Sequence, residues 1–530
     1  MPSTKKLLSI TDLKKYFPVA KSSIFQRQQL YVRANEEISL DIYEGETLGI
    51  VGESGCGKST LGRVLLQLYD QTAGTTMYYG RSRASIAPKY VLETLSHADK
   101  YIAKLHKKQA KAAELTKKVE ELGENASFFD IQNMNLAVAE EKTALAHIVK
   151  ILGGFLVRDT ANGAKLLLQR AKLEDELAQI NQQIDDLEYE IKELDPQKEA
   201  SKGDKLRLKM EGCRKQAESL TGRIAQFDQQ ITSAKAPYIN DPEFQKYEEM
   251  LDDGIDLARL KYSEMRLLRK DLQIIFQDPY SSLNPRMTVG QIIEEGLVTH
   301  KFFKAGSEKG KEYILDVMRK CGLQDYMLHR YPHQFSGGQR QRISIARALA
   351  VNPKFVVCDE CVSALDVSIQ SQIINLLQEL KETNNLTYMF ISHDLSVVRY
   401  ISDRICVMYL GNVVELADSK TIFEDPRHPY TVALLSSIPT TDPEAIKKER
   451  ILLEGNIPSP IKPPDGCKFH TRCYMACETC KRVPPPLTEV EPGHFLACHF
   501  PQKKLDENGN YLFELPKLAS VSRDPAPTAE

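Results

Sequence analysis

The chain has 530 residues, of which 27% are charged and 42% are hydrophobic, so its length allows several domains. Its formal net charge of −2 gives no overall positive charge for binding nucleic acid. It contains no run of about 18 or more apolar residues and no apolar signal-peptide core, so we do not expect the chain itself to cross a membrane. Eleven scattered cysteines favour a reducing compartment, where clustered cysteines bind metal more often than they form disulfides.

The first motif in chain order is a phosphate-binding loop. Its glycines let backbone N–H groups point at the phosphates, while Lys58 adds a positive charge and Ser59 a hydroxyl for Mg²⁺. An apolar strand expected at 46–51 and a helix expected at 60–66 supply the context that such a loop requires. The residues expected to bind nucleotide here are Gly52, Glu53, Ser54, Gly55, Cys56, Gly57, Lys58, Ser59 and Thr60.

Two carboxylates follow a second apolar run at 355–358. Asp359 is placed to hold Mg²⁺ through water, and Glu360 to polarise the water that attacks the γ-phosphate. A buried strand that ends at a solvated acidic turn is the alternative, and the phosphate loop upstream makes it the weaker one.

Further motifs resemble those of the ABC ATPase family. Residues 331–342 resemble the family signature, with Phe335 where Leu is more usual, and residues 363–366 resemble its D-loop. The resemblance implies two nucleotide domains paired head to tail, each capping the partner's ATP with its signature. It implies that Gln277 belongs to the metal site and links it to a membrane partner, and that His393 contacts the γ-phosphate. The site residues carried over from these motifs are Gln277, Ser336, Gly337, Gly338, Gln339, Asp366 and His393.

An aromatic side chain near the N-terminus is expected to stack on adenine. We prefer Phe17 to Tyr16 because of its spacing from Leu13. An ordinary strand-edge aromatic pair is the alternative.

Several longer segments of the sequence are similar to those of the oligopeptide/dipeptide importer ATPases. The similar segments are 52–63, 273–287 and 362–370, with Cys56 and Pro279-Tyr280 resembling the F-type subunit, and 422–435 leading into a C-terminal extension. Cys361 departs from the family, where a small residue or Pro is commoner. The resemblance implies an ATPase that powers peptide uptake at the cytoplasmic face of the cell membrane. Its implied partners are a second, D-type ATPase subunit, two transmembrane permease subunits and, indirectly, an extracytoplasmic peptide-binding protein, with no nucleic acid. A nickel or other small-solute importer is the alternative.

Four cysteines near the C-terminus form a second candidate site. The spacing of Cys467, Cys473, Cys480 and Cys498 resembles the motif that ligates a [4Fe-4S] cluster in peptide importer ATPases. Four thiolates also suit tetrahedral zinc, and unmetallated thiols are a third possibility. The expected role is to hold together a Pro-rich segment with little core of its own.

Residues 81–252 interrupt the family pattern. Heptad spacing runs from Leu166 to Leu194 and returns from Leu206 to Ile231, which predicts an antiparallel coiled-coil hairpin. Each arm of about 28 residues would reach on the order of 40 Å. Residues 96–122 and 134–152 are expected to be helical too. We weigh a regulatory or docking arm against a solvated decoration without function.

The predicted fold is α/β. It has a RecA-like P-loop ABC ATPase core with an antiparallel β-subdomain and a helical signature subdomain, plus the coiled-coil insertion and the Cys-rich extension. The expected domains are 1–80 and 253–415 for the two parts of the nucleotide domain, 81–252 for the insertion, 416–505 for the extension and 506–530 for a tail. DNA-associated coiled-coil ABC ATPases are a further alternative. In them the coil follows the family's Q-loop, the loop that Gln277 marks in this sequence, whereas here it precedes Gln277.

Overall fold

The computed structural model describes residues 5–21, 28–194, 199–363, 365–438 and 451–500. They form two compact units, which are described separately: residues 5–46 with 59–391, and residues 47–58 with 392–500. Within the described residues, no helix is both long enough and apolar enough to span a membrane.

The first unit contains a four-stranded antiparallel sheet in the order β2-β1-β4-β5. Its strands are β1 (Lys6–Pro18), β2 (Tyr31–Tyr43), β4 (Ala73–Tyr78) and β5 (Ile255–Asp256). In β4, Met77 lies opposite Asp256 of β5, so the chain leaves this sheet after β4 and returns beside the same strand. An insertion at such a point costs little loop-closure entropy.

Three parallel strands form the other sheet of the first unit. Strand β7 (Phe355–Asp359) lies between β6 (Leu272–Ile275) and β8 (Thr387–Ile391). Strands β7 and β8 are buried along their whole length, as expected for parallel strands covered on both faces. Helix α14 (Val367–Asn384) connects them. This arrangement places Asp359 at the carboxyl end of a buried strand.

Four α-helices of the first unit lie between β6 and β7, a stretch that the structure describes throughout. They are α10 (Pro279–Ser282), α11 (Val289–Thr299), α12 (Glu308–Lys320) and α13 (Gly337–Leu349), and helices α1 (Lys58–Leu65) and α9 (Tyr262–Leu268) precede β6 in the sequence. Helix α13 contacts α10, α11 and α12, so the residues predicted as the signature begin the central helix of this group.

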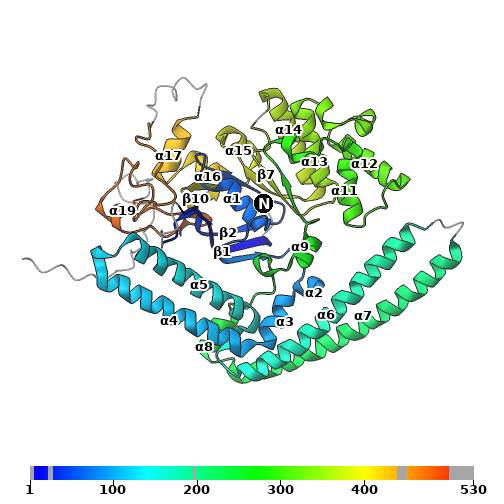
Figure 1. Ribbon diagram of the computed structural model, residues 1–530, viewed down its shortest axis with the longest axis horizontal. Coiled ribbons are helices and arrows are strands. Elements are labelled where there is room, and N and C mark those ends of the chain that lie inside the picture. The colour runs from blue at the N-terminus through cyan, green and yellow to red at the C-terminus, as the bar shows by residue number, and fades with distance from the viewer. Residues whose placement is uncertain (1–4, 22–27, 195–198, 364, 439–450, 501–530) are drawn as a thin grey trace, which may run out of the picture. The chain divides into compact units, whose positions relative to one another are not determined.

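The segment between β4 and β5 is helical (Figure 1). It contains α2 (Arg83–Ile86), α3 (Lys89–Ser96), α4 (Ala98–Leu122), α5 (Phe128–Leu152), α6 (Thr160–Lys192), α7 (Ala200–Lys235) and α8 (Pro242–Glu248). A buried cluster of residues from α3, α4, α5 and α6 forms its core. A smaller cluster around Phe155, Ile231 and Phe244 closes the base of α7.

Helices α6 and α7 are the longest in the molecule and pack against each other. Arg170 pairs with Asp228 at the base, and Glu188 pairs with Arg214 farther out. As the residue number rises along α6 from 170 to 188, the number of the contacting residue on α7 falls from 228 to 214, so the two helices are antiparallel. On α7 the buried residues Cys213, Leu220 and Ile231 lie at predicted heptad positions, as do Leu173 and Leu187 on α6.

The far end of α6 contacts the loop between α11 and α12 in the same unit. Asp186 forms an ion pair with Lys301 at 2.7 Å, and the Lys192 ammonium lies 4.4 Å from the centre of the Phe303 ring. Lys192 also donates to the carbonyl of Phe302 at 3.4 Å. The helical insertion therefore reaches the group of helices that carries the signature.

The second unit is built on a sheet in the order β11-β12-β10-β9-β3, in which only β3 and β9 are parallel. Its strands are β3 (Thr47–Val51), β9 (Arg404–Tyr409), β10 (Asn412–Asp418), β11 (Thr488–Glu491) and β12 (His494–Leu496), and its helices are α15 (Leu395–Ile401), α16 (Ser419–Glu424), α17 (Pro429–Ser436) and α19 (Glu478–Arg482).

A buried carboxylate ties the C-terminal segments of this unit to its sheet. Glu415 of β10 accepts hydrogen bonds from the backbone N–H groups of Arg427 and His428, and lies 2.8 Å from the His494 ring. Buried polar groups are costly unless they are paired. These contacts therefore hold two separate parts of the extension, at 427–428 and at 494, against β10.

Candidate active site

The phosphate loop follows strand β3 in the second unit. Gly52, Gly55 and Gly57 have φ angles of 147°, 81° and 101°, in the region that favours glycine. A Cβ atom on Gly52 would lie 2.2 Å from the carbonyl oxygen of Met408, so this position also needs glycine for space. The Lys58 ammonium donates to the carbonyls of Gly52 at 2.7 Å and Glu53 at 3.2 Å, which holds it against the loop. Ser54 and Gly55 are exposed at the loop's tip.

Helix α1 begins at the last residue of the loop and continues in the first unit, where the structure joins two predicted Mg²⁺ ligands. The Ser59 hydroxyl donates to Asp359 at 2.5 Å. Asp359 is 1% exposed and also lies 3.4 Å from the Arg63 guanidinium. A hydroxyl beside a buried carboxylate, directly after a phosphate loop, is a donor set that suits a hard cation such as Mg²⁺. Thr60 follows in the first turn of α1.

Gln277 and Glu360 are also in direct contact. The Gln277 amide donates to the Glu360 carboxylate at 2.8 Å. Glu360 has a φ of 47° and its N–H donates to the carbonyl of Ile391 at 3.0 Å, so the backbone at this position is held in an unusual conformation by β8. The carboxylate predicted to act on water is therefore oriented by both its backbone and its side-chain partner.

The signature residues begin helix α13. The Ser336 hydroxyl accepts from the N–H of Gln339, whose side chain in turn accepts from the N–H of Ser336, forming a capping box. Ser336 and Gly337 are exposed. A Cβ atom on Gly338 would lie 2.5 Å from Ile369 of α14. An exposed helix start of this kind favours the negative charge of an anion.

The remaining predicted contact residues are Asp366, His393 and an aromatic near the N-terminus. Asp366 begins α14, and His393 is exposed just before α15 in the second unit. Tyr16 is buried and its hydroxyl donates to Glu36 at 2.5 Å, whereas Phe17 is only partly buried, with its ring 5.4 Å from that of Tyr69. Phe17 is therefore the more exposed of the two aromatics, and the Lys15 ammonium lies 4.6 Å from the centre of its ring.

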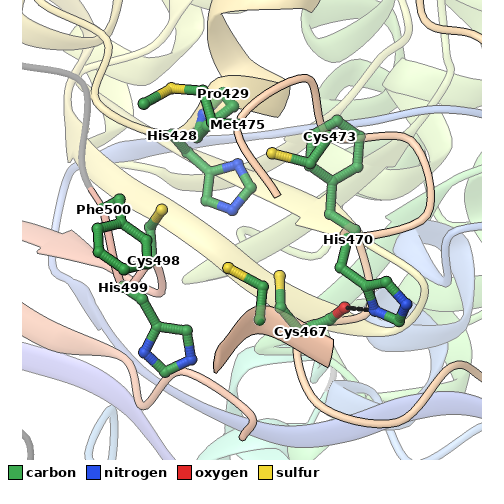
Figure 2. Close-up of a pocket in the computed structure, with 11 residues that line it drawn as sticks. His428, Pro429, Cys467, His470, Cys473, Met475, Cys498, His499 and Phe500 are labelled. Atoms are coloured by element: carbon green, nitrogen blue, oxygen red, sulfur yellow. Dashed lines mark hydrogen bonds between the residues drawn. The ribbon is translucent and has the colours of Figure 1, made fainter. Parts of the chain in front are cut away.

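A small cavity in the second unit, partly open to solvent, is lined by all four predicted cysteine ligands. Figure 2 shows Cys467, Cys473 and Cys498 around it, together with His428, His470 and His499. Burial raises the pKa of Cys467 to about 11 and that of Cys498 to about 12. Cys477 does not line the cavity, but its sulfur lies 3.6 Å from that of Cys480.

The four thiols line one cavity, but in this structure they are not close enough together to coordinate a metal ion. Throughout the described ranges, no three or more His, Cys, Asp or Glu side chains are grouped closely enough to hold a metal ion. The expectation of a [4Fe-4S] cluster therefore has support from the kind and number of donors around one cavity, and none from their present spacing.

Two residues that no motif assigned to the nucleotide site contact the phosphate loop. Tyr430 and Arg472 both bind Glu53, from positions 377 and 419 residues away in the sequence. Sequence reasoning missed them because no local pattern marks a contact over such a separation.

Comparison with known proteins agrees with this site. The ABC transporter family model matches residues 35–220 and 243–363, and the model of the oligopeptide/dipeptide transporter C-terminal region matches residues 414–480. The chain is 34% identical over 494 residues to the oligopeptide transport ATP-binding protein AppF of Bacillus subtilis, covering 93% of this chain and 97% of that protein.

Two further relatives match over a shorter part of the chain. The putative oligopeptide transport ATP-binding protein YkfD of Bacillus subtilis is 53% identical over 248 residues, covering 46% of this chain and 75% of that protein. The oligopeptide transport ATP-binding protein OppF of Haemophilus influenzae is 50% identical over 251 residues, covering 47% and 75%.

Proposed function

Because this chain belongs to the ABC transporter family of ATP-binding proteins, with its similar relatives named for oligopeptide transport, we propose that it hydrolyses ATP to power the uptake of oligopeptides or dipeptides. The resemblance found in the motifs is thereby confirmed at the level of the family. The observation that carries the proposal is the contact between Ser59 and Asp359, which brings the end of the phosphate loop and the end of β7 together as an ATPase requires.

Each residue of the site has a role in hydrolysis. The loop N–H groups and Lys58 bind the β- and γ-phosphates. Ser59 and Asp359, with Gln277 nearby, would hold Mg²⁺, which when bound neutralises charge on the phosphates. Glu360 accepts the proton of the attacking water, and Gln277 keeps its carboxylate in place through the 2.8 Å hydrogen bond.

The exposed signature is the basis for proposing a partner ATPase. Ser336 and Gly337 are exposed at the start of α13, where N–H groups of the first helical turn can meet a phosphate. In a head-to-tail pair with a second, D-type subunit these groups cap the partner's γ-phosphate, and the partner's signature caps the ATP held by Lys58. His393 senses the γ-phosphate, Asp366 lies at the interface, and Phe17 stacks on adenine.

The remaining partners follow from the transport role. Two permease subunits and, through them, an extracytoplasmic peptide-binding protein complete the importer, with this chain on the cytoplasmic face of the membrane. A nickel importer is the second candidate substrate class, and the relatives' names favour peptide.

The insertion at 81–252 is proposed to be a coiled-coil subdomain that acts as a regulatory or docking arm. Its buried heptad positions and the Asp186–Lys301 ion pair near its far end support this role.

The extension is proposed to hold a [4Fe-4S] cluster through Cys467, Cys473, Cys480 and Cys498. Their shared cavity supports it, because four thiols suit such a cluster. When bound, the cluster would cross-link three chain segments and so stabilise the extension. Zinc is the alternative.

Affinity purification of the tagged full chain from native membranes, without oxygen, tests these proposals. We expect mass spectrometry to find two multi-spanning membrane proteins and a second ABC ATPase. A preparation that contains none of them, or that contains DNA instead, would contradict the importer.

The same preparation decides the cofactor. We expect about four iron atoms and four sulfides per chain. Cys498→Ser should lose them, whereas Cys477→Ser, outside the cavity, should keep them. Zinc without sulfide, or no metal at all, would disprove the cluster.

A further inference from the structure

The cysteine-bearing segment of the second unit contacts the phosphate loop directly. Arg472, one residue before Cys473, donates to the Glu53 carboxylate through both terminal nitrogens: Nη1 to Oε2 at 2.6 Å and Nη2 to Oε1 at 3.0 Å. The Arg472 side chain is 6% exposed and that of Glu53 is 26% exposed. A bidentate pair with little exposure is stronger and more directional than a surface ion pair, so it fixes the position of Glu53.

A second contact holds the backbone at the same residue. The N–H of Glu53 donates to the hydroxyl of Tyr430 at 2.9 Å. Tyr430 is fully buried, and its ring centre lies 5.3 Å from that of Phe469, which lies between Cys467 and Cys473 in the sequence. Both the side chain and the backbone of Glu53 are therefore held by residues of the C-terminal extension.

Glu53 in turn affects the groups that bind phosphate. Its carbonyl oxygen accepts a hydrogen bond from Lys58, so a movement of Glu53 shifts an acceptor that orients this ammonium. Its carboxylate also brings negative charge into a loop that must receive a triphosphate. Pairing with Arg472 offsets that charge, which would otherwise repel the ligand.

We propose that Arg472 is a positioning residue for ATP binding, through which the cysteine-bearing segment holds the phosphate loop ready for the nucleotide. This role rests on the proposed ATPase function and needs no assumption about what the four cysteines bind. Because both of these Arg472 hydrogen bonds go to Glu53 of the phosphate loop, Arg472 governs the affinity for MgATP rather than the chemical step.

The test is Arg472→Met in the full chain, assembled with its partners, with ATP hydrolysis measured against MgATP concentration. We expect KM to rise about tenfold and kcat to change less than about twofold. Arg472→Lys keeps the charge without the fork and should recover part of the affinity. Arg482→Met, an exposed arginine of the same segment, is the matched control and should leave KM unchanged.

A double-mutant cycle with Glu53→Gln separates positioning from general damage. In that background Arg472→Met should change KM by less than about twofold, because the pair it would break is already absent. The same fold-change in both backgrounds would overturn the proposal, as would a lower kcat with an unchanged KM. Absence of hydrolysis by the intact chain in the same assembly, at every MgATP concentration, would instead overturn the ATPase function on which the proposal rests.

Discussion

At the scale of single residues, Glu360 stands in an unusual position. Its φ of 47° costs on the order of 1 kcal/mol for a residue other than glycine. The hydrogen bond from its N–H to Ile391 and the one from Gln277 to its carboxylate maintain this conformation. Strain in the backbone of Glu360, directly after the buried strand β7, indicates that the orientation of its carboxylate is important for function.

Replacement of this carboxylate tests its role. Glu360→Gln keeps the size of the side chain but removes the proton acceptor, so turnover in the assembled complex should fall by about 10²–10⁴-fold while ATP remains bound. Hydrolysis rates and retention of labelled ATP after gel filtration measure both effects. Glu382→Gln, an exposed change on α14, is the control. Unchanged turnover in Glu360→Gln would disprove the assignment.

The motifs predicted which residues matter but not all of their contacts. The pairs Ser59–Asp359 and Gln277–Glu360 unite residues that were all named in advance, because each motif carries its own local pattern. Arg472 could not be predicted, since a bidentate contact between residues 53 and 472 depends on the folded extension. The roles of the signature residues, Asp366 and His393 stay predictions.

At the scale of elements, heptad spacing correctly predicted that the segments of α6 and α7 are helical. Apolar residues at this spacing form one stripe along a helix. Helix α5 begins at Phe128, six residues before the expected start at 134, because Ser127 and Asp130 form a capping box. The contact of α6 with the loop between α11 and α12 had no sequence signal. It joins side chains more than 100 residues apart.

The half of the α6–α7 hairpin that is distant from the Arg170–Asp228 pair can be removed while the other half is kept. Replacing residues 178–220 by four Gly and Ser residues keeps the Arg170–Asp228 pair and the buried cluster of Phe155, Ile231 and Phe244. The linker can span two packed helices, which lie about 10 Å apart. Outside the hairpin, Asp186 and Lys192 of the removed segment form hydrogen bonds with Lys301, Phe302 and Lys309, which belong to the loop after α11 and to α12.

We therefore expect this deletion to leave MgATP affinity within about twofold of the intact chain, as for independent sites. Nucleotide titration, with thermal melting to verify folding, is the measurement. Loss of binding in a folded variant would show that the hairpin belongs to the nucleotide site.

At the scale of the whole molecule, the chain combines elements of its family with a long helical segment between β4 and β5. The family match and the coverage of 97% of AppF account for the ATPase core and the extension. The expectation that residues 81–252 are an insertion rests on their interruption of the family pattern. In the structure, β4 and β5 on either side of this segment are hydrogen-bonded neighbours. The domain boundaries expected from sequence stay predictions. The cysteine cavity was foreseen as a cluster of residues, but spacing along the chain does not determine how closely the thiols approach.

The central claim is that ATP hydrolysis by this chain powers peptide uptake. Uptake of a labelled oligopeptide should be measured in cells of the source organism that lack the gene and carry either the intact chain or Glu360→Gln, with labelled nickel as a second solute. The account predicts peptide accumulation only with the intact chain and equal nickel uptake in both. Equal peptide uptake in the two strains would contradict it, and loss of nickel uptake alone would assign the chain to metal import.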